Sequence, residues 1–210
     1  QSQELVALAQ GLELFHTPDK QCYAVITVNE RKQVVSLKSK NLRQYLGKLF
    51  HEKFERPPNA QPLQDALGLL SGKALYESEE KTVHTRTATV DQTIYLDLCN
   101  DKGEVVQITQ SGWDVIANPP VHFLAPNGLQ PLPCPQRGGT MEELKKFINV
   151  RSEDQWILIV SWLLKAYIPH GASPILTIQG EQGSAKSTTA KMMKALTDPA
   201  KAPLRTLPRN

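Results

Sequence analysis

The residues best suited to chemistry form one short run near the end of the chain, Gly-Glu-Gln-Gly-Ser-Ala-Lys-Ser-Thr. Glycines let backbone N–H groups approach an anion closely, and a lysine and hydroxyl groups at this spacing are typical of a loop that holds phosphate. The predicted nucleotide-binding residues are Gly180, Glu181, Gln182, Gly183, Ser184, Ala185, Lys186, Ser187 and Thr188. We expect the Lys186 ammonium to contact the β- and γ-phosphates of ATP and the Ser187 hydroxyl to ligate Mg²⁺.

Ala185 is a departure from the strict pattern, in which glycine comes immediately before the lysine. Glycine at that position keeps a Cβ atom away from backbone that must approach the phosphate. Because alanine adds only one methyl group, we expect a lower affinity for nucleotide and an intact site. The alternative interpretation is an ordinary strand–turn–helix in which the glycines and the lysine are incidental.

The residues on either side of this run predict the elements that position it. Residues 174–179 are mostly apolar and suit a buried parallel strand. Residues 187–196 suit a helix that ends at Asp198 and Pro199. The positive end of that helix dipole would favour an anion at the loop.

Two further helices are predicted before the strand. Residues 140–143 have the pattern of a capping box and open a short helix. Ser152 repeats the start signal ahead of residues 156–168, which are apolar on most of the helix circumference. We therefore expect the second of these helices to be largely buried.

The chain divides at a segment rich in proline and glycine. Residues 118–139 contain six prolines and three glycines, which excludes a helix interior or a central strand. The sequence predicts an α+β accessory domain over residues 1–117, a linker over 118–139, and the first part of a P-loop NTPase domain over 140–210. The fold class is mixed α/β.

The first region shows the periods of both helix and strand. Residues 22–29 and 33–37 alternate around a plausible hairpin turn. Ser39 can cap a helix whose apolar residues recur at helical spacing: Leu42, Tyr45, Leu46, Leu49, Phe50 and Phe54. A second helix follows residues 57–59, and strands are predicted at residues 83–90, 93–99 and 105–109, with a turn at 100–103.

Basic charge is concentrated in one part of this region. The chain carries a net charge of +3, whereas residues 31–56 hold eight Lys or Arg and two Glu, a net charge of +6. A basic helix face could neutralise DNA or RNA phosphates and would then bind in a salt-dependent way. The candidate nucleic-acid contacts are Lys38, Lys40, Arg43 and Lys48. The alternative is a solvated helix face.

Other residue types argue against several function classes. The chain has three widely separated cysteines, Cys22, Cys99 and Cys134, and five scattered histidines. Their number and spacing favour neither a disulfide framework nor a zinc site. Free cysteines fit a cytoplasmic location. The longest apolar run, residues 156–164, is too short to span a bilayer, so no membrane is expected. His16 and Asp19 share a turn, and we expect local hydrogen bonding there rather than catalysis.

Residues 162–167, in a predicted helix, and residues 174–190, which cover the predicted strand and the loop, carry a resemblance to a known family. These residues resemble the ATPase module of primase-helicase-like proteins of phages, plasmids and integrated elements, within the AAA+ class near the superfamily 3 helicases. The upstream segments 15–19, 59–67 and 94–98 are similar to the region that precedes the ATPase in that group. The resemblance therefore covers most of the chain.

The resemblance implies an ATP-driven motor that assembles into a ring and acts on DNA during replication of a mobile element. Such ATPases carry, after the phosphate loop, a strand ending in acidic residues, a polar sensor and an arginine finger. We expect this chain to be a fragment that stops before that strand, binds ATP weakly and does not hydrolyse it. Asp97 follows the apolar residues 94–96, precedes the loop, and is expected to be a strand end rather than the metal carboxylate.

Two alternatives remain at the level of function. In the first, the chain is a nucleic-acid-binding or assembly module and the loop is a remnant that does not hydrolyse nucleotide. In the second, the chain is a P-loop kinase of small molecules, which is disfavoured because those enzymes place the loop near the start of the chain. Here 179 residues precede Gly180.

Overall fold

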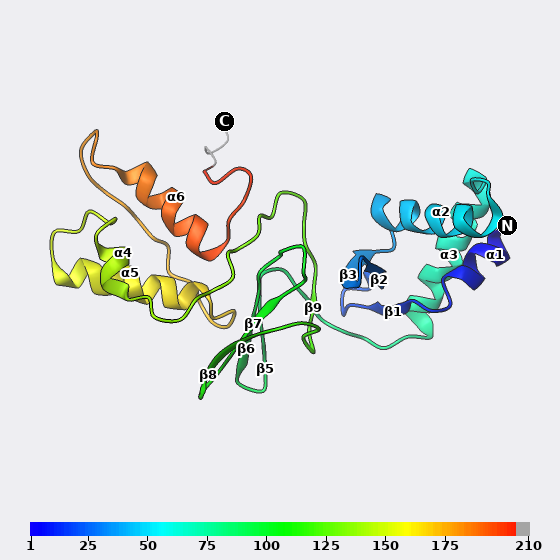
Figure 1. Cartoon of the computed structure of the whole chain (residues 1–210), viewed down its shortest axis with the longest axis horizontal. Helices are drawn as coiled ribbons and strands as arrows, with labels where there is room; N and C mark the ends of the chain where they lie inside the picture. Colours follow the sequence, from blue (N-terminus) through cyan, green and yellow to red (C-terminus); the bar gives the residue numbers. More distant parts are fainter. Residues whose placement is uncertain (205–210) are drawn as a thin grey trace. The chain divides into compact units, whose positions relative to one another are not determined.

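The computed structural model describes residues 1–204, which form two compact units (Figure 1). The first unit contains Gln1–His84 and Pro120–Leu124, and the second contains Thr85–Pro119 and the chain from Ala125. The sequence placed residues 1–117 in one domain, whereas the structure groups residues 85–117 with the second unit. The chain leaves the first unit after His84 and returns to it for one short strand.

The first unit consists of three helices and five strands. Its elements are α1 (Ser2–Leu8), β1 (Glu13–His16), β2 (Cys22–Val28), β3 (Arg31–Ser36), α2 (Lys40–Phe54), α3 (Ala60–Tyr76), β4 (Val83–His84) and β9 (His122–Phe123). Strands β1, β2 and β3 form an antiparallel sheet in that order, and β4 pairs in parallel with β9. The strand β1 was not predicted.

The predicted hairpin is confirmed. Strands β2 and β3 pair with Val28 opposite Arg31, so that Asn29 and Glu30 form a two-residue turn. Both turn residues have positive φ angles, 49° and 65°. That backbone twist matches the right-handed twist of the flanking strands, and asparagine adopts it at low cost.

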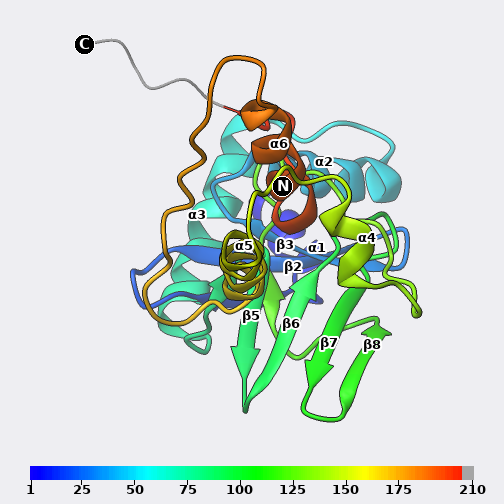
Figure 2. The same cartoon turned by 90° about the vertical axis from the view of Figure 1, so that its left-hand side faces the viewer.

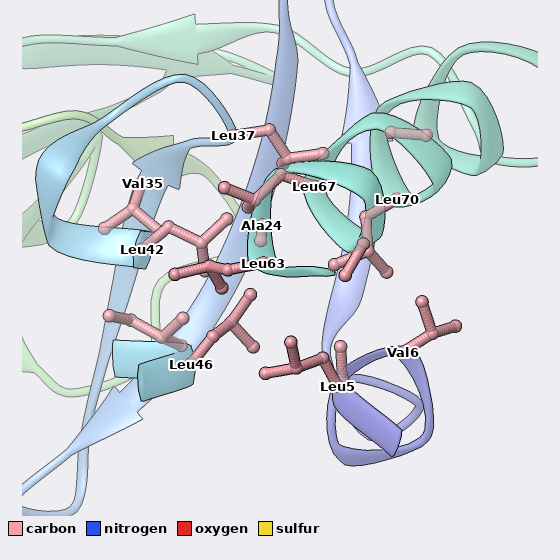
Figure 3. Close-up of a cluster of buried hydrophobic side chains, with 14 of the residues drawn as sticks. Leu5, Val6, Ala24, Val35, Leu37, Leu42, Leu46, Leu63, Leu67 and Leu70 are labelled. Carbon is pink, nitrogen blue, oxygen red and sulfur yellow. The ribbon is translucent and has the colours of Figure 1, made fainter. Parts of the chain in front are cut away.

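The first unit is held together by one apolar core, in which helix α2 supplies a single stripe. The Ser39 side chain accepts a hydrogen bond from the backbone N–H of Leu42 and caps the helix as predicted. The buried residues of the stripe are Leu42, Leu46 and Phe50, and they belong to the same core as buried residues of α3. Figure 3 shows Leu42 and Leu46 in this cluster. Helix α2 therefore faces the core with residues that the 3.6-residue period indicated.

As far as residue 204, the second unit combines an antiparallel sheet with three helices. Its elements are β5 (Thr87–Val90), β6 (Thr93–Asp97), β7 (Val105–Thr109), β8 (Gly112–Ile116), α4 (Met141–Lys145), α5 (Glu153–Ala166) and α6 (Lys186–Thr197). The four strands lie side by side in sequence order (Figure 2). The strand predicted over residues 83–90 is interrupted, because β4 and β5 pair with different partners and Arg86 lies between them.

The predicted helix starts in this unit are confirmed. The Glu143 carboxylate accepts a hydrogen bond from the backbone N–H of Thr140 at the start of α4. The Ser152 hydroxyl accepts one from the N–H of Gln155 at the start of α5. These contacts satisfy donors that have no partner within a helix.

Two predictions about this unit are wrong. Residues 174–179 are not a buried strand, because no strand within residues 1–204 pairs with them, and Ile175 is 92 % exposed. Helix α5 is not largely buried, because neighbours cover only the side that carries Trp156 and Leu163. Leu158, at 67 % exposure, lies on the uncovered side.

The described residues define a mixed α/β chain with small sheets, and the parallel sheet of a P-loop fold is not among them. A parallel strand depends on hydrogen bonds to neighbouring strands, so an apolar segment without such neighbours stays outside a sheet. Across residues 1–204, the helices are too short or too polar to cross a lipid bilayer.

Candidate nucleotide-binding loop

The ammonium group of Lys186 lies inside the curve of the loop that precedes α6. Its Nζ donates hydrogen bonds to the backbone oxygens of Gly180 and Glu181, at 2.8 and 2.6 Å, and contacts Ser184 Oγ at 3.3 Å. The carbonyl oxygens carry partial negative charge and hold the lysine against the loop backbone. The loop therefore concentrates a full positive charge at the start of a helix.

Gly180 leaves room for the Ser184 side chain in this tight curve. A Cβ atom at that position would lie 2.5 Å from Ser184 Oγ, which is closer than real Cβ contacts. Gly183 has a φ angle of 83°, in the left-handed region that glycine adopts without penalty. The two glycines of the run therefore have distinct roles, one for space and one for conformation.

Ala185 is the N-cap of α6 and has φ 62° and ψ 19°, the left-handed helical conformation. This explains why the phosphate-loop pattern has glycine at this position: a residue with a Cβ meets a steric cost there. Within the described chain, no side chain caps the helix through a hydrogen bond to its first turn. The N–H groups of that turn are thus oriented toward any anion at the loop.

The hydroxyl residues of the run differ in exposure. Ser187 and Thr188 are exposed in the first turn of α6, where a serine hydroxyl can reach a metal ion. Thr189, in contrast, is buried, and its Oγ1 donates a hydrogen bond to the Ala185 carbonyl at 3.1 Å. The residues present fit a phosphate and its magnesium ion: an ammonium group, uncapped N–H groups and an exposed hydroxyl.

A cavity of about 800 Å³ adjoins the loop. Its wall combines apolar side chains of α5 and the 174–179 segment with the loop and the turn before α5: Leu158, Ile159, Trp162, Ile175, Ser184, Lys186 and Arg151. A volume of this order is typical of small-molecule sites, and the wall contains both apolar and polar side chains. The cavity and the phosphate loop form one continuous candidate site.

The candidate nucleic-acid residues lie in the first unit. Lys38, Lys40, Arg43 and Lys48 are all exposed. Arg43 donates a hydrogen bond from Nη2 to Gln64 Oε1 at 2.6 Å, and Lys48 Nζ lies 3.4 Å from a Glu52 carboxylate oxygen. Helix α2 thus presents basic side chains to solvent, two of them with partners on the protein surface.

The other titratable residues singled out in the sequence have structural partners. The Asp19 carboxylate accepts from the Thr17 hydroxyl at 2.5 Å, while His16 Nδ1 contacts the Ala74 oxygen at 2.8 Å, so each shapes the fold separately. Asp97 ends strand β6, is buried, and accepts from the Cys99 N–H at 2.8 Å. Within residues 1–204, three or more His, Cys, Asp or Glu do not gather into a metal-binding group.

Arg86 is a buried residue that no sequence pattern indicated. Its side chain is buried and contacts three segments of the second unit. Neither spacing nor a motif marks it, because its partners are 11 to 112 positions away in the chain. An arginine inside the strand predicted over residues 83–90 was the available signal.

A scan against protein-family models, a search of curated proteins and a search of solved structures each gave no match to this chain. The functional interpretation therefore depends on the residues and geometry described above.

Proposed function

We propose that this chain binds ATP with Mg²⁺ at residues 180–188, as the nucleotide-binding part of a motor ATPase of the primase-helicase class. The observation that carries the proposal is the Lys186 ammonium, held by the Gly180 and Glu181 carbonyls at the start of an uncapped helix. Positive charge, N–H donors and a helix dipole converge on one point there, and such a point favours a polyphosphate.

Each group of the loop has a role in this proposal. The N–H groups of the first turn of α6 donate to phosphate oxygens, and Lys186 exchanges carbonyl partners for the β- and γ-phosphates. Ser187 would hold the magnesium ion, which neutralises phosphate charge when bound. The nucleoside extends into the adjoining cavity, whose apolar wall suits a base and whose Arg151 and loop hydroxyls suit polar groups.

The test compares Mg-ATP binding by the wild-type chain, Lys186→Ala and Lys191→Ala, using a fluorescent nucleotide at several salt concentrations. Lys191 is an exposed lysine of the same helix and keeps the change in charge equal. We expect Lys186→Ala to weaken binding on the order of 10- to 100-fold, the worth of a charge-assisted hydrogen bond. Equal affinity of all three proteins, or no binding by the wild type, would contradict the proposal.

ATP turnover tests whether the chain also hydrolyses the nucleotide that it binds. Hydrolysis needs a carboxylate that orients water and holds the metal, and Glu181 is the only acidic residue between positions 180 and 188. We propose binding without turnover for the chain by itself. Phosphate release at a steady rate, abolished by Lys186→Ala, would show that the chain is itself a working ATPase.

The exposed basic face of α2 favours a second candidate function, binding of DNA. We propose that Lys38, Lys40 and Lys48, with Arg43 beside them, contact backbone phosphates. Each phosphate contact steepens the dependence of affinity on salt, because counterions are released. The candidate is independent of the loop, since these residues belong to the other unit.

Charge reversal tests this candidate. The triple variant Lys38→Glu, Lys40→Glu and Lys48→Glu is compared with a control that reverses three exposed lysines of the second unit: Lys102, Lys146 and Lys201. We expect the α2 variant to bind duplex DNA more weakly and to show a flatter salt slope, by nearly one for each phosphate that it no longer neutralises. Equal weakening in both variants would indicate non-specific attraction, and unchanged binding in both would exclude the candidate.

A further inference from the structure

Arg86 is a buried cation at the junction of three segments of the second unit. It is 7 % exposed. Its Nη1 donates to the Asp97 carbonyl at 2.9 Å, its Nη2 to the Gln130 carbonyl at 2.8 Å, and its Nε to Asp198 Oδ1 at 3.2 Å. A buried guanidinium that lost these partners would have neither water nor protein acceptors for its N–H groups, which is costly. The hydrogen bonds of Arg86 therefore hold the three segments together.

One of the three partners, Asp198, directly follows the last residue of the helix that begins at the phosphate loop. Asp198 is the C-cap of α6, and its second carboxylate oxygen accepts from Lys194 one turn earlier. Burial by itself would raise the pKa of Asp198, but the hydrogen bonds and charges of Lys194 and Arg86 outweigh burial and lower it. The carboxylate is therefore charged at neutral pH and pairs with Arg86.

The chain beyond α6 is fixed to the same place. The Gln130 N–H donates to the Pro199 oxygen and the Lys201 N–H to the Gly128 oxygen, both at 2.9 Å. Leu129 and Ala200 form an antiparallel bridge between these two bonds. Segment 128–130, which accepts from Arg86 through Gln130, therefore also holds the residues that follow the helix.

Helix α6 connects this junction with the nucleotide loop. It has 12 residues, a length of about 18 Å, and carries Lys186 at its first position. In contrast to the firmly bonded C-terminal end, the first turn has an N-cap without side-chain hydrogen bonds among the described residues. A hydrogen-bonded helix moves largely as a rigid body, so its anchored end determines where the loop end lies.

We propose that Arg86 is a positioning residue for the phosphate site: it holds the C-terminal end of α6 and thereby sets the loop at the other end. The coupling is reciprocal, so nucleotide at the loop stabilises the bonds around Arg86. This inference rests on the proposed nucleotide binding. Because Arg86 also bonds to Asp97 at the end of β6, the four-stranded sheet would support the phosphate site.

The test uses the full chain with Arg86→Lys, and with Arg137→Lys as the matched control. Arg137 donates to the Trp113 carbonyl and to Asp114 in the same unit, both of which lie outside α6. Lysine keeps the charge but cannot reach three acceptors at once. We expect Arg86→Lys to weaken Mg-ATP binding about five- to tenfold and Arg137→Lys to leave it unchanged.

Amide hydrogen exchange supplies a measurement that a purely structural role would not change. In the wild type, saturating Mg-ATP should slow exchange of the Asp97 and Gln130 amides, which donate to the backbone oxygens of Arg86 and Pro199. Arg86→Lys should abolish that nucleotide-dependent slowing. If the slowing persists in Arg86→Lys, or is absent in a wild type that binds nucleotide, the inference is wrong.

A second variant and a measurement without nucleotide distinguish a failure of this inference from a failure of the proposed nucleotide binding. Asp198→Ala removes the α6 partner at a half-exposed position, so it tests the same link if Arg86→Lys fails to fold. If the wild type binds no nucleotide, the proposed function is wrong. The link between Arg86 and the loop end of α6 is then tested by the hydrogen-exchange rate of the Thr189 amide, measured without nucleotide. Faster exchange in Arg86→Lys and not in Arg137→Lys supports the link along α6; equal rates overturn it.

Discussion

Replacing Ala185 with glycine tests the geometry of the loop most directly. Ala185 has φ 62° and ψ 19°, where the Cβ of an L-residue is crowded at a cost of about 1–2 kcal/mol. Glycine avoids that cost, although it also gives the unfolded chain freedom worth about 0.4–1 kcal/mol. The difference predicts that Ala185→Gly stabilises the first turn of α6 by about 0.5–1 kcal/mol.

Native-state hydrogen exchange of the Thr189 amide measures this change locally. That N–H donates to the Ala185 oxygen at 2.9 Å and is exposed only when the first turn opens. A gain of this size slows its exchange about two- to fivefold. Ala190→Gly, in the regular part of α6, is the matched control, and there glycine costs about 1 kcal/mol and speeds exchange.

The reasoning would be refuted by one clear result. If Thr189 in Ala185→Gly exchanges at the wild-type rate or faster, while Ala190→Gly behaves as expected, Ala185 does not adopt the left-handed conformation in solution. The variant should also bind Mg-ATP at least as tightly as the wild type, because it restores the strict phosphate-loop pattern.

Two other substitutions test the structure. Gly180→Ala would place a Cβ 2.5 Å from Ser184 Oγ, so Mg-ATP affinity should fall on the order of tenfold and recover in part with Ser184→Ala; unchanged affinity would contradict the tight loop. In the first unit, the hydrogen bond from Lys81 is the main cause that holds the pKa of Glu13 below its ordinary 4.5. The associated stability is present above the unfolded pKa and lost as pH falls through the lowered folded value. Glu13→Gln should therefore flatten the acid limb of unfolding free energy against pH in urea titrations, and an unaltered limb would exclude this contribution.

Local patterns were sufficient for much of the first unit. The turn at Asn29 and Glu30, the Ser39 cap and the apolar stripes of α2 and α3 all depend on residues within a few positions of one another. Such features are decided by backbone sterics and by the helical and strand periods, which a sequence displays directly. The same holds for the boundaries of α6 and for the glycines and lysine of the loop.

Features that depend on distant partners were not predictable in this way. Apolar composition suggested a buried strand at residues 174–179 and a buried α5, yet burial requires a covering surface, and the described chain supplies it on one side of α5 only. The sequence marked Ala185 as a departure from the pattern, but the left-handed conformation of this residue is visible only in the backbone angles.

The sequence by itself determined which residues are available for chemistry: a lysine, glycines and hydroxyls at phosphate-loop spacing, and a basic helix elsewhere. The tertiary structure decided how that chemistry is supported. Arg86 meets Asp198 across 112 positions, and residues 120–124 return to the first unit to pair with β4. A buried charge needs a partner, and a short strand needs a neighbour, but the whole fold decides which distant residue supplies it. Neighbouring residues in the sequence therefore do not predict such contacts.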